Sequence, residues 1–233
     1  MILSENTGIT LYNQADEIII SGTALGKVEE EKAIRKIGFK DGDLIAITGE
    51  IGLAALGFEI LKDENIKLIK NGLENEKISR KIVDLGIKKV LKPIAKFNEV
   101  KILREFASSA TDITDGLASE LYKIFNADKE YDKNSNLGLI IYEDKLVNER
   151  IFKEIYKVSK LINKDPLDLI LHIGEDFEVL FTYTNNNIYN IAAHNDFIII
   201  GEVNNSNKVE IKLSNGKIKE LSSRGYEHLL IKD

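Results

Sequence analysis

Two aspartates stand three residues apart in the stretch Ala110-Thr111-Asp112-Ile113-Thr114-Asp115-Gly116-Leu117, with a threonine hydroxyl between them and a glycine behind them. Carboxylates in a turn can converge on a hard divalent cation, and the N–H groups at a helix start attract phosphate oxygens. The alternative is that Thr114 or Asp115 caps the following helix and that Asp112 is a surface charge. From this stretch alone, both interpretations stay open.

A second stretch, His172-Ile173-Gly174-Glu175-Asp176-Phe177-Glu178, places three acids around a glycine just ahead of an apolar segment. It is typical either of a solvated loop or of a rim that binds a metal or a cationic or hydroxyl-bearing substrate. His172 is a conceivable base, although a single histidine at a helix end more often satisfies a local carbonyl.

A third stretch, Gly49-Glu50-Ile51-Gly52, connects an expected strand to an expected helix. Its backbone is able to cradle a phosphate, or its glycines serve only to allow close packing. It lacks the Gly-Lys-Ser/Thr ending of a P-loop and does not match the dinucleotide fingerprint.

The amino-acid composition excludes several classes of site and of protein. The 233 residues are 43% hydrophobic and 30% charged, with a formal charge of −6 and no cysteine. Disulfides, zinc-thiolate sites and cysteine nucleophiles are therefore excluded, and no apolar run approaches the ~20 residues that span a bilayer. Because the lysines are not concentrated on one segment, we expect no nucleic-acid partner. The first residues do not resemble a secretory signal, so a cytoplasmic location is expected.

The elements that must position these stretches alternate between strands and helices. We expect strands at 16–23, 43–48, 137–142, 177–182 and 197–203, and helices at 28–37, 53–61, 75–91, 100–106, 117–125, 149–161, 165–171 and 188–194. A hairpin is expected around Asn215-Gly216, because both turn positions tolerate positive φ. The continuous apolar centre of 43–48 predicts a strand that is buried on both faces. This alternation predicts a layered α/β or α+β fold.

The order and spacing of the motifs resemble the thiamine-monophosphate kinase family. The resemblance covers the chain from about Asp16 to its end, and the Gly-Glu-Asp-Phe-Glu segment is its most specific part. It rests on the segments Ile20–Gly26, Gly42–Gly49, Asp112–Leu117, Gly174–Thr182, Ile200–Val203 and Gly225–His228.

This resemblance implies the aminoimidazole ribonucleotide synthetase-like fold in two parts. Residues 1–31 are expected to be a remnant of the N-terminal ATP- and metal-binding domain, and residues 32–233 to be the C-terminal domain. Family members carry a further N-terminal part with a paired-aspartate metal motif and a Gly-Gly-Asp-Thr segment, neither of which occurs here. The chain is therefore expected to correspond to the last two-thirds of a larger enzyme, and a homodimer or a complementing N-terminal polypeptide is an expected partner.

The resemblance also implies a reaction and its residues. The γ-phosphoryl group of ATP would pass directly to thiamine monophosphate, giving thiamine diphosphate with no covalent enzyme intermediate and hence no catalytic nucleophile. Asp112 and Asp115 would hold Mg²⁺, and Thr114 with the basic pair Arg35-Lys36 would contact ATP. The residues implied to face thiamine monophosphate are Glu175, Asp176 and Tyr226.

Because the N-terminal motifs do not occur in this sequence, the chain alone is not expected to assemble the family's multi-metal cluster. Two alternatives therefore stand beside a kinase: an inactive ligand-binding or interaction module, and a sibling synthetase or phosphotransferase of the same fold.

Overall fold

The computed structural model of the chain describes residues 4–10, 19–147, 150–184 and 197–223. These residues fall into two compact units, Met1–Ala33 and Ile34–Asp233. Two sequence predictions, Tyr226 and the helix at 188–194, lie outside the described residues.

The first unit contains a two-stranded antiparallel ribbon. Strand β1 (Ser4–Thr10) pairs with β2 (Ile19–Leu25) over seven residues, with Ser4 opposite Leu25. The described part of the strand predicted at 16–23 is therefore a strand, and it has β1 as its partner.

The helix predicted at 28–37 is wrong. Only one 3-10 turn, η1 (Glu30–Lys32), forms there, and none of its residues is buried. Three consecutive glutamates and an exposed Val28 leave the first half of this segment without an apolar stripe to pack a helix. From Ile34 onward the chain instead runs along strand β4, where the Arg35 carbonyl accepts a hydrogen bond from the Ala110 N–H at 2.9 Å.

The second unit is built on a seven-stranded sheet with the order β4-β6-β3-β7-β5-β8-β9. Neighbouring strands are antiparallel except for β5 and β8, which are parallel. Most of these strands were predicted within two residues, and the Asn215-Gly216 hairpin is confirmed by the pairing of β8 with β9. The strands are β3 (Leu44–Ile47), β4 (Ala107–Asp112), β5 (Gly138–Tyr142), β6 (Val179–Tyr183), β7 (Ile198–Asn204), β8 (Val209–Lys212) and β9 (Ile218–Glu220).

The described residues of this unit also contain eight α-helices. The one at Leu53–Leu61 was predicted to the residue, whereas those at Ile66–Glu74 and Glu143–Val147 were missed. They are α1 (Leu53–Leu61), α2 (Ile66–Glu74), α3 (Arg80–Leu91), α4 (Phe97–Leu103), α5 (Leu117–Tyr131), α6 (Glu143–Val147), α7 (Arg150–Leu161) and α8 (Pro166–His172); a 3-10 turn, η2 (Asp63–Asn65), joins α1 to α2.

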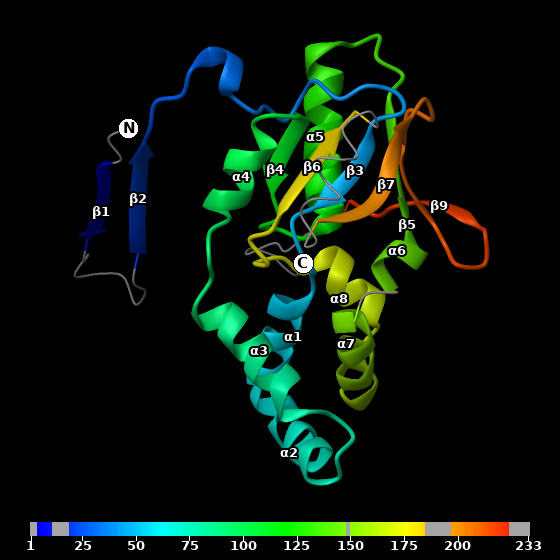
Figure 1. Cartoon of the computed structure of the whole chain (residues 1–233). Coiled ribbons are helices and arrows are strands. Elements are labelled where there is room, and N and C mark those ends of the chain that lie inside the picture. The colour runs from blue at the N-terminus through cyan, green and yellow to red at the C-terminus, as the bar shows by residue number, and fades with distance from the viewer. Residues whose placement is uncertain (1–3, 11–18, 148–149, 185–196, 224–233) are drawn as a thin grey trace, which may run out of the picture. The chain divides into compact units, whose positions relative to one another are not determined.

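Both faces of the sheet are covered, as the apolar centre of β3 predicts. Ile45 and Ile47 belong to the large core that the sheet shares with α5 and α8, whereas Ala46 belongs to a smaller core with Phe181 and Leu103 on the opposite face. Successive side chains of a strand point to opposite faces, and all three β3 residues are at most 1% exposed. Figure 1 shows α5 along one face and α4 near the other.

Helices α1, α2, α3 and α7 form a separate helical group beyond one end of the sheet (Figure 1). They share their own apolar core, which includes Leu56, Ile82 and Ile155. Helices α1 and α3 approach closely through glycines, since a methyl group added at Gly57 would lie 2.2 Å from the carbonyl oxygen of Gly86. Within the described residues, no helix is both long and apolar enough to span a membrane.

Candidate active site at the ends of β3, β4 and β6

The three sequence stretches meet at one end of the sheet. Strand β6 lies between β3 and β4 and is antiparallel to both. The segments that follow β3 and β4 therefore flank the segment that precedes β6. This topology brings together residues 48–52, 112–116 and 172–178, which are far apart in the sequence.

Backbone hydrogen bonds join the second stretch to the first. The Ile113 N–H donates to the Glu178 carbonyl at 2.8 Å, and the Phe177 N–H donates to the Ile113 carbonyl at 3.0 Å. The Glu175 N–H donates to the Thr114 carbonyl at 2.8 Å. The loop that carries Glu175 is thus fixed against the turn that carries Thr114, in the manner of a short extension of the β4–β6 ladder.

This close approach depends on Gly174 and on unusual backbone angles. A methyl group at Gly174 would lie 1.8 Å from the Thr114 carbonyl oxygen, so no larger residue fits without movement. Glu175 and Phe177 have φ angles of 67° and 50°. Positive φ is uncommon for residues other than glycine and costs free energy that the surrounding contacts must offset.

The Asp112–Asp115 turn is organised from beneath by Glu120, which is fully buried in α5. Its carboxylate accepts hydrogen bonds from the Thr114 hydroxyl at 3.2 Å and from the Asp115 N–H at 3.3 Å. The N-cap position of α5 is Gly116, so the interpretation of Thr114 or Asp115 as the cap is wrong. Asp112 ends β4 and is exposed.

Lys123 places a positive charge on this turn. Its ammonium group lies 2.5 Å from Asp115 Oδ2 and 2.6 Å from Glu120 Oε1. Partial burial acts to lower the pKa of Lys123, but the hydrogen bonds and charges of Asp115 and Glu120 outweigh it and raise the pKa overall. Lys123 therefore stays protonated and neutralises Asp115.

The donor set suits a hard cation, because carboxylate oxygens are the ligands that Mg²⁺ prefers. Asp112 and Asp115 lie in the same turn, with Asp112 exposed and Asp115 partly exposed. Across the described residues, however, no three His, Asp or Glu side chains are grouped closely enough to hold a metal ion by themselves. A cation at this turn would thus need further oxygen ligands, such as those of a bound phosphate.

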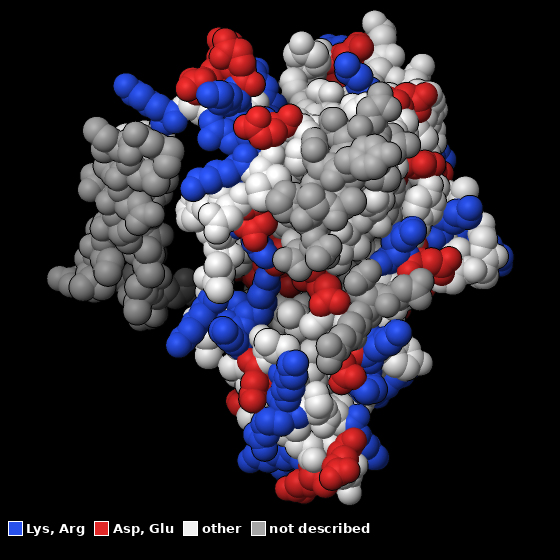
Figure 2. Space-filling view, viewed as in Figure 1, with Lys and Arg blue, Asp and Glu red and all other residues white. Residues whose placement is uncertain are grey.

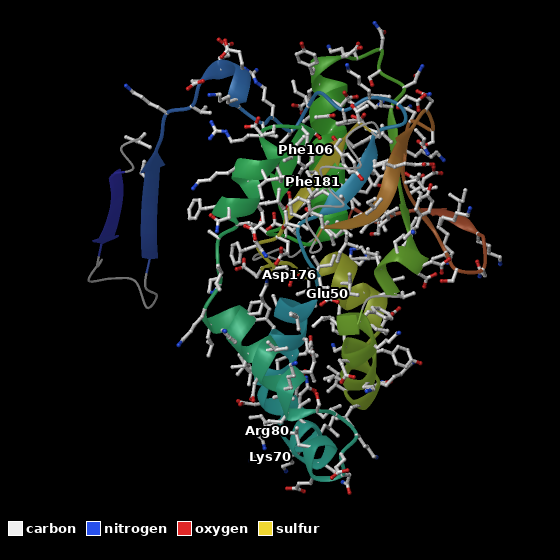
Figure 3. All side chains as sticks on the ribbon, in the orientation of Figure 1. Glu50, Lys70, Arg80, Phe106, Asp176 and Phe181 are labelled. Atoms are coloured by element: carbon white, nitrogen blue, oxygen red, sulfur yellow. The ribbon has the colours of Figure 1, made fainter. Side chains whose placement is uncertain are left out.

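Asp176 is buried between the sheet and the helical group, in the region where Figure 3 also shows Glu50. Its carboxylate accepts hydrogen bonds from the Gly52 N–H at 2.7 Å and from the Ala54 N–H at 3.1 Å. Burial raises the pKa of Asp176 to about 6, although these two hydrogen bonds oppose the rise. Both carboxylate oxygens thus bind the start of α1, and the predicted contact with a substrate would require these bonds to open.

Gly49-Glu50-Ile51-Gly52 also serves this packing. A methyl group at Gly49 would lie 2.9 Å from the Glu178 carboxylate, and the Gly52 N–H is used by Asp176. The Glu50 carboxylate accepts from the Ile151 N–H at 3.2 Å, at the start of α7. The packing interpretation of this stretch is therefore the one that its contacts favour.

Sequence reasoning missed the role of Glu178. Its carboxylate is 4% exposed and accepts from Thr48 Oγ1 at 2.8 Å, from Lys89 Nζ at 2.8 Å and from Lys96 Nζ at 2.9 Å. Burial acts to raise the pKa of Glu178, but the two lysines and Thr48 outweigh it and lower the pKa overall. Lys92-Pro93 marks the end of α3 in the sequence, but nothing in the sequence indicates that Lys96 contacts Glu178.

The remaining predicted residues lie as follows. Arg35 and Lys36 have exposed side chains on the segment beside β4, and Arg35 is level with Ala110, two residues before Asp112. His172 ends α8 and lies 4.0 Å from the Asp168 carboxylate. Tyr226 is outside the described residues. A cavity of about 770 Å³ between the α2–α3 turn and α7 is lined by Glu50 of the third stretch but by no residue of the first two stretches.

Comparison with known proteins gives the same family that the motifs resemble. The thiamine-monophosphate kinase of Pyrococcus horikoshii is 35% identical over 218 residues, which are 93% of this chain and 59% of that protein. The chain thus spans less than two-thirds of the length of the relatives it matches. No family model matches the sequence.

Solved structures establish the fold. AaThiL complexed with AMPPCP and TMP matches with a TM-score of 0.62 and 23% identity, over 84% of this chain and 54% of that one. HypE of E. coli, a hydrogenase maturation protein, matches with a TM-score of 0.62 and 18% identity, over 94% and 61%. The predicted α/β class and aminoimidazole ribonucleotide synthetase-like fold are therefore confirmed. Over nearly its whole length, the chain is a homologue of thiamine-monophosphate kinases.

Proposed function

We propose that this chain supplies part of the site of a thiamine-monophosphate kinase, which transfers the γ-phosphoryl group of ATP to thiamine monophosphate. The observation that carries the proposal is the backbone pairing of residues 113–114 with residues 175–178, which fixes Asp112, Thr114 and Asp115 beside Glu175. Phosphoryl transfer depends on positioning and on neutralising charge, and this pairing brings cation ligands next to an acidic rim.

In this proposal, Asp112 and Asp115 hold Mg²⁺ together with the phosphate oxygens of ATP. The cation offsets the negative charge of the phosphates when it is bound. The Thr114 hydroxyl, Arg35 and Lys36 contact the nucleotide, and Glu175 faces thiamine monophosphate. We assign Asp176 a positioning role, since its carboxylate binds the start of α1. The predicted contact of Tyr226 with the substrate stays a prediction.

The names of the relatives support the proposed substrates, but the chain covers only part of the homologue's length. The homologue that is 35% identical is named for thiamine monophosphate, and AaThiL was determined with AMPPCP and TMP. The chain spans 59% of that homologue, and a homodimer or a complementing polypeptide is proposed as its partner. Light scattering, which measures the molar mass with and without ATP, tests whether two copies of the chain associate. The expected cytoplasmic location also stays a prediction.

Calorimetric titration with MgATP and with thiamine monophosphate tests the proposal, followed by an assay for thiamine diphosphate. We expect both ligands to bind. The double variant Asp112→Asn/Asp115→Asn should lower the affinity for MgATP, whereas Asp84→Asn, at an exposed position of α3, should leave that affinity unchanged. Binding without turnover would favour the ligand-binding module. If neither ligand binds, or if another acceptor is phosphorylated, the proposed function is wrong.

A further inference from the structure

Four lysines gather where α3 ends and α4 begins. Lys88 and Lys89 lie in the last turn of α3, Lys92 follows it, and Lys96 precedes α4. Figure 2 shows basic side chains gathered over this part of the molecule. All four line a cavity of about 300 Å³, together with Leu53, Leu85, Ile94, Ala95, Asn98 and Glu99.

Two of these lysines, Lys89 and Lys96, are held in place by the buried carboxylate of Glu178. Lys89 and Lys96 each bind one oxygen of the Glu178 carboxylate, and their side chains are only 19% and 21% exposed. A lysine near a helix C-terminus is ordinarily explained by the helix dipole, which accounts for Lys88 and Lys89. It does not account for Lys96, which approaches the same carboxylate from before α4.

The charges at this cavity do not balance. Glu178 faces two ammonium groups at once, and Glu99 is a distant second partner of Lys96 at 3.9 Å. Lys88 and Lys92 are exposed and add further positive charge at the opening. Four lysines thus face two carboxylates, and this excess of positive charge at the cavity would attract an anion.

The walls of the cavity indicate the kind of anion. Lysine ammonium groups are compact point charges that bind phosphate oxygens through several N–H donors. Leu53, Leu85 and Ile94 provide an apolar wall beside them, and such a wall adds affinity for a nonpolar group. From this combination we propose that the cavity binds the phosphate group of a small organic phosphate, whose nonpolar part lies against the three apolar residues.

Phenyl phosphate and inorganic phosphate, titrated calorimetrically at constant ionic strength, test this site. We expect the unmodified chain to bind phenyl phosphate more tightly than inorganic phosphate. The double variant Lys88→Gln/Lys92→Gln should lower the affinity for phenyl phosphate by about tenfold or more, since two nearby positive charges are lost. Both side chains are exposed, so the variant is expected to fold. The matched control is Lys67→Gln/Lys70→Gln on α2, which removes the same charge away from the cavity.

Three results would overturn the proposal. They are the absence of phenyl phosphate binding, an equal loss of affinity in both double variants, and binding of inorganic phosphate as tight as that of the organic probe. The second result would mean non-specific attraction, and the third would mean that free phosphate is the ligand. Because Asp112 and Asp115 do not line the cavity, Asp112→Asn/Asp115→Asn should leave phenyl phosphate binding unchanged, which separates this site from the proposed function.

Discussion

The backbone N–H of Gly52 donates a 2.7 Å hydrogen bond to the carboxylate of Asp176, which lies 124 residues later in the sequence. Gly52 is the N-cap residue of α1, and Asp176 follows Glu175 in the loop before β6. One buried side chain therefore connects the helical group to the loop that borders the Asp112–Asp115 turn.

This contact predicts a pH dependence of stability. Burial raises the pKa of Asp176 to about 6, above its value in the unfolded chain. The stability that Asp176 contributes is therefore fully present below about pH 4 and is lost as the pH rises through 6. Relative to Asp176→Asn, the free energy of unfolding of the unmodified chain should fall by up to ~3 kcal/mol from pH 4 to pH 8, since each pKa unit is worth about 1.4 kcal/mol.

Urea denaturation of both proteins at several pH values measures this difference. Asp84→Asn, at an exposed position of α3, serves as the control and should show no such change. A difference that is flat with pH would show that folding leaves the pKa of Asp176 unchanged, and one that grows as the pH rises would show that the fold prefers the anion.

Glu178 should have the opposite pH dependence. Its pKa is lowered overall because Lys89, Lys96 and Thr48 outweigh the effect of burial. Its contribution is thus present above the unfolded pKa and is lost as the pH falls through the lowered pKa. Glu178→Gln should cost about 2–4 kcal/mol at pH 7, because it leaves two partly buried ammonium groups without their counter-charge.

The cost of Glu178→Gln should shrink as the pH falls below the ordinary glutamate pKa of 4.5, because the unfolded chain then takes up a proton at this carboxylate, and it should disappear below the lowered pKa of the folded chain. Thermal and urea unfolding at pH 7 and at pH 3.5 check this, with the more exposed Glu99→Gln as the matched control. Equal costs at the two pH values would contradict an ionised Glu178 as the source of the stability.

Local patterns were enough to predict much of the fold. The apolar run of β3 and the glycines around α1 specify their elements within a few residues, because burial and backbone flexibility act locally there. The prediction failed at 28–37, where Glu30–Lys32 form only a 3-10 turn and the Arg35 carbonyl accepts a hydrogen bond from Ala110 of β4. It also missed α2, whose few buried residues, among them Ile69, pack on helices distant in the sequence. The contacts that decide α2 are tertiary, and no window of sequence contains them.

The candidate site was predictable in its residue types but not in their roles. Motif spacing singled out Asp112, Thr114 and Glu175, and the β4–β6 pairing brings these together. The same reasoning could not distinguish Asp176, which is buried, from Glu175, which is partly exposed, because neighbouring acids look alike in a sequence. The role of Glu178 depends on Lys89 at a separation of 89 residues, which only the fold reveals.

Gly174→Ala should disrupt the junction between the two motif loops. The added methyl group would lie 1.8 Å from the Thr114 carbonyl oxygen, and backbone atoms on both sides cannot yield as a flexible side chain would. We expect a loss of about 2 kcal/mol or more in unfolding free energy, by the overpacking effect. Hydrogen exchange should be faster at the N–H groups of Glu175 and Phe177.

Gly22→Ala is the control for this substitution, since a methyl group there would meet no atom within 4 Å. If Gly174→Ala leaves both the stability and the exchange rates of residues 175 and 177 unchanged, the two loops are not fixed against each other as described.

Lys123 should compete with a divalent cation for Asp115. Its ammonium group lies 2.5 Å from Asp115 Oδ2, so Lys123→Gln removes a positive charge from the proposed metal ligand. Because the Asp115 side chain is 43% exposed, solvent screens the repulsion to about 1 kcal/mol, which corresponds to about fivefold in affinity. The affinity for Mn²⁺, measured by electron paramagnetic resonance, should therefore be about fivefold higher in Lys123→Gln than in the unmodified chain. In Lys133→Gln, which changes an exposed lysine beyond the end of α5, it should stay unchanged. Equal tightening in both variants would indicate a general effect of net charge, and no tightening in either would place the Mn²⁺ ion away from Asp115.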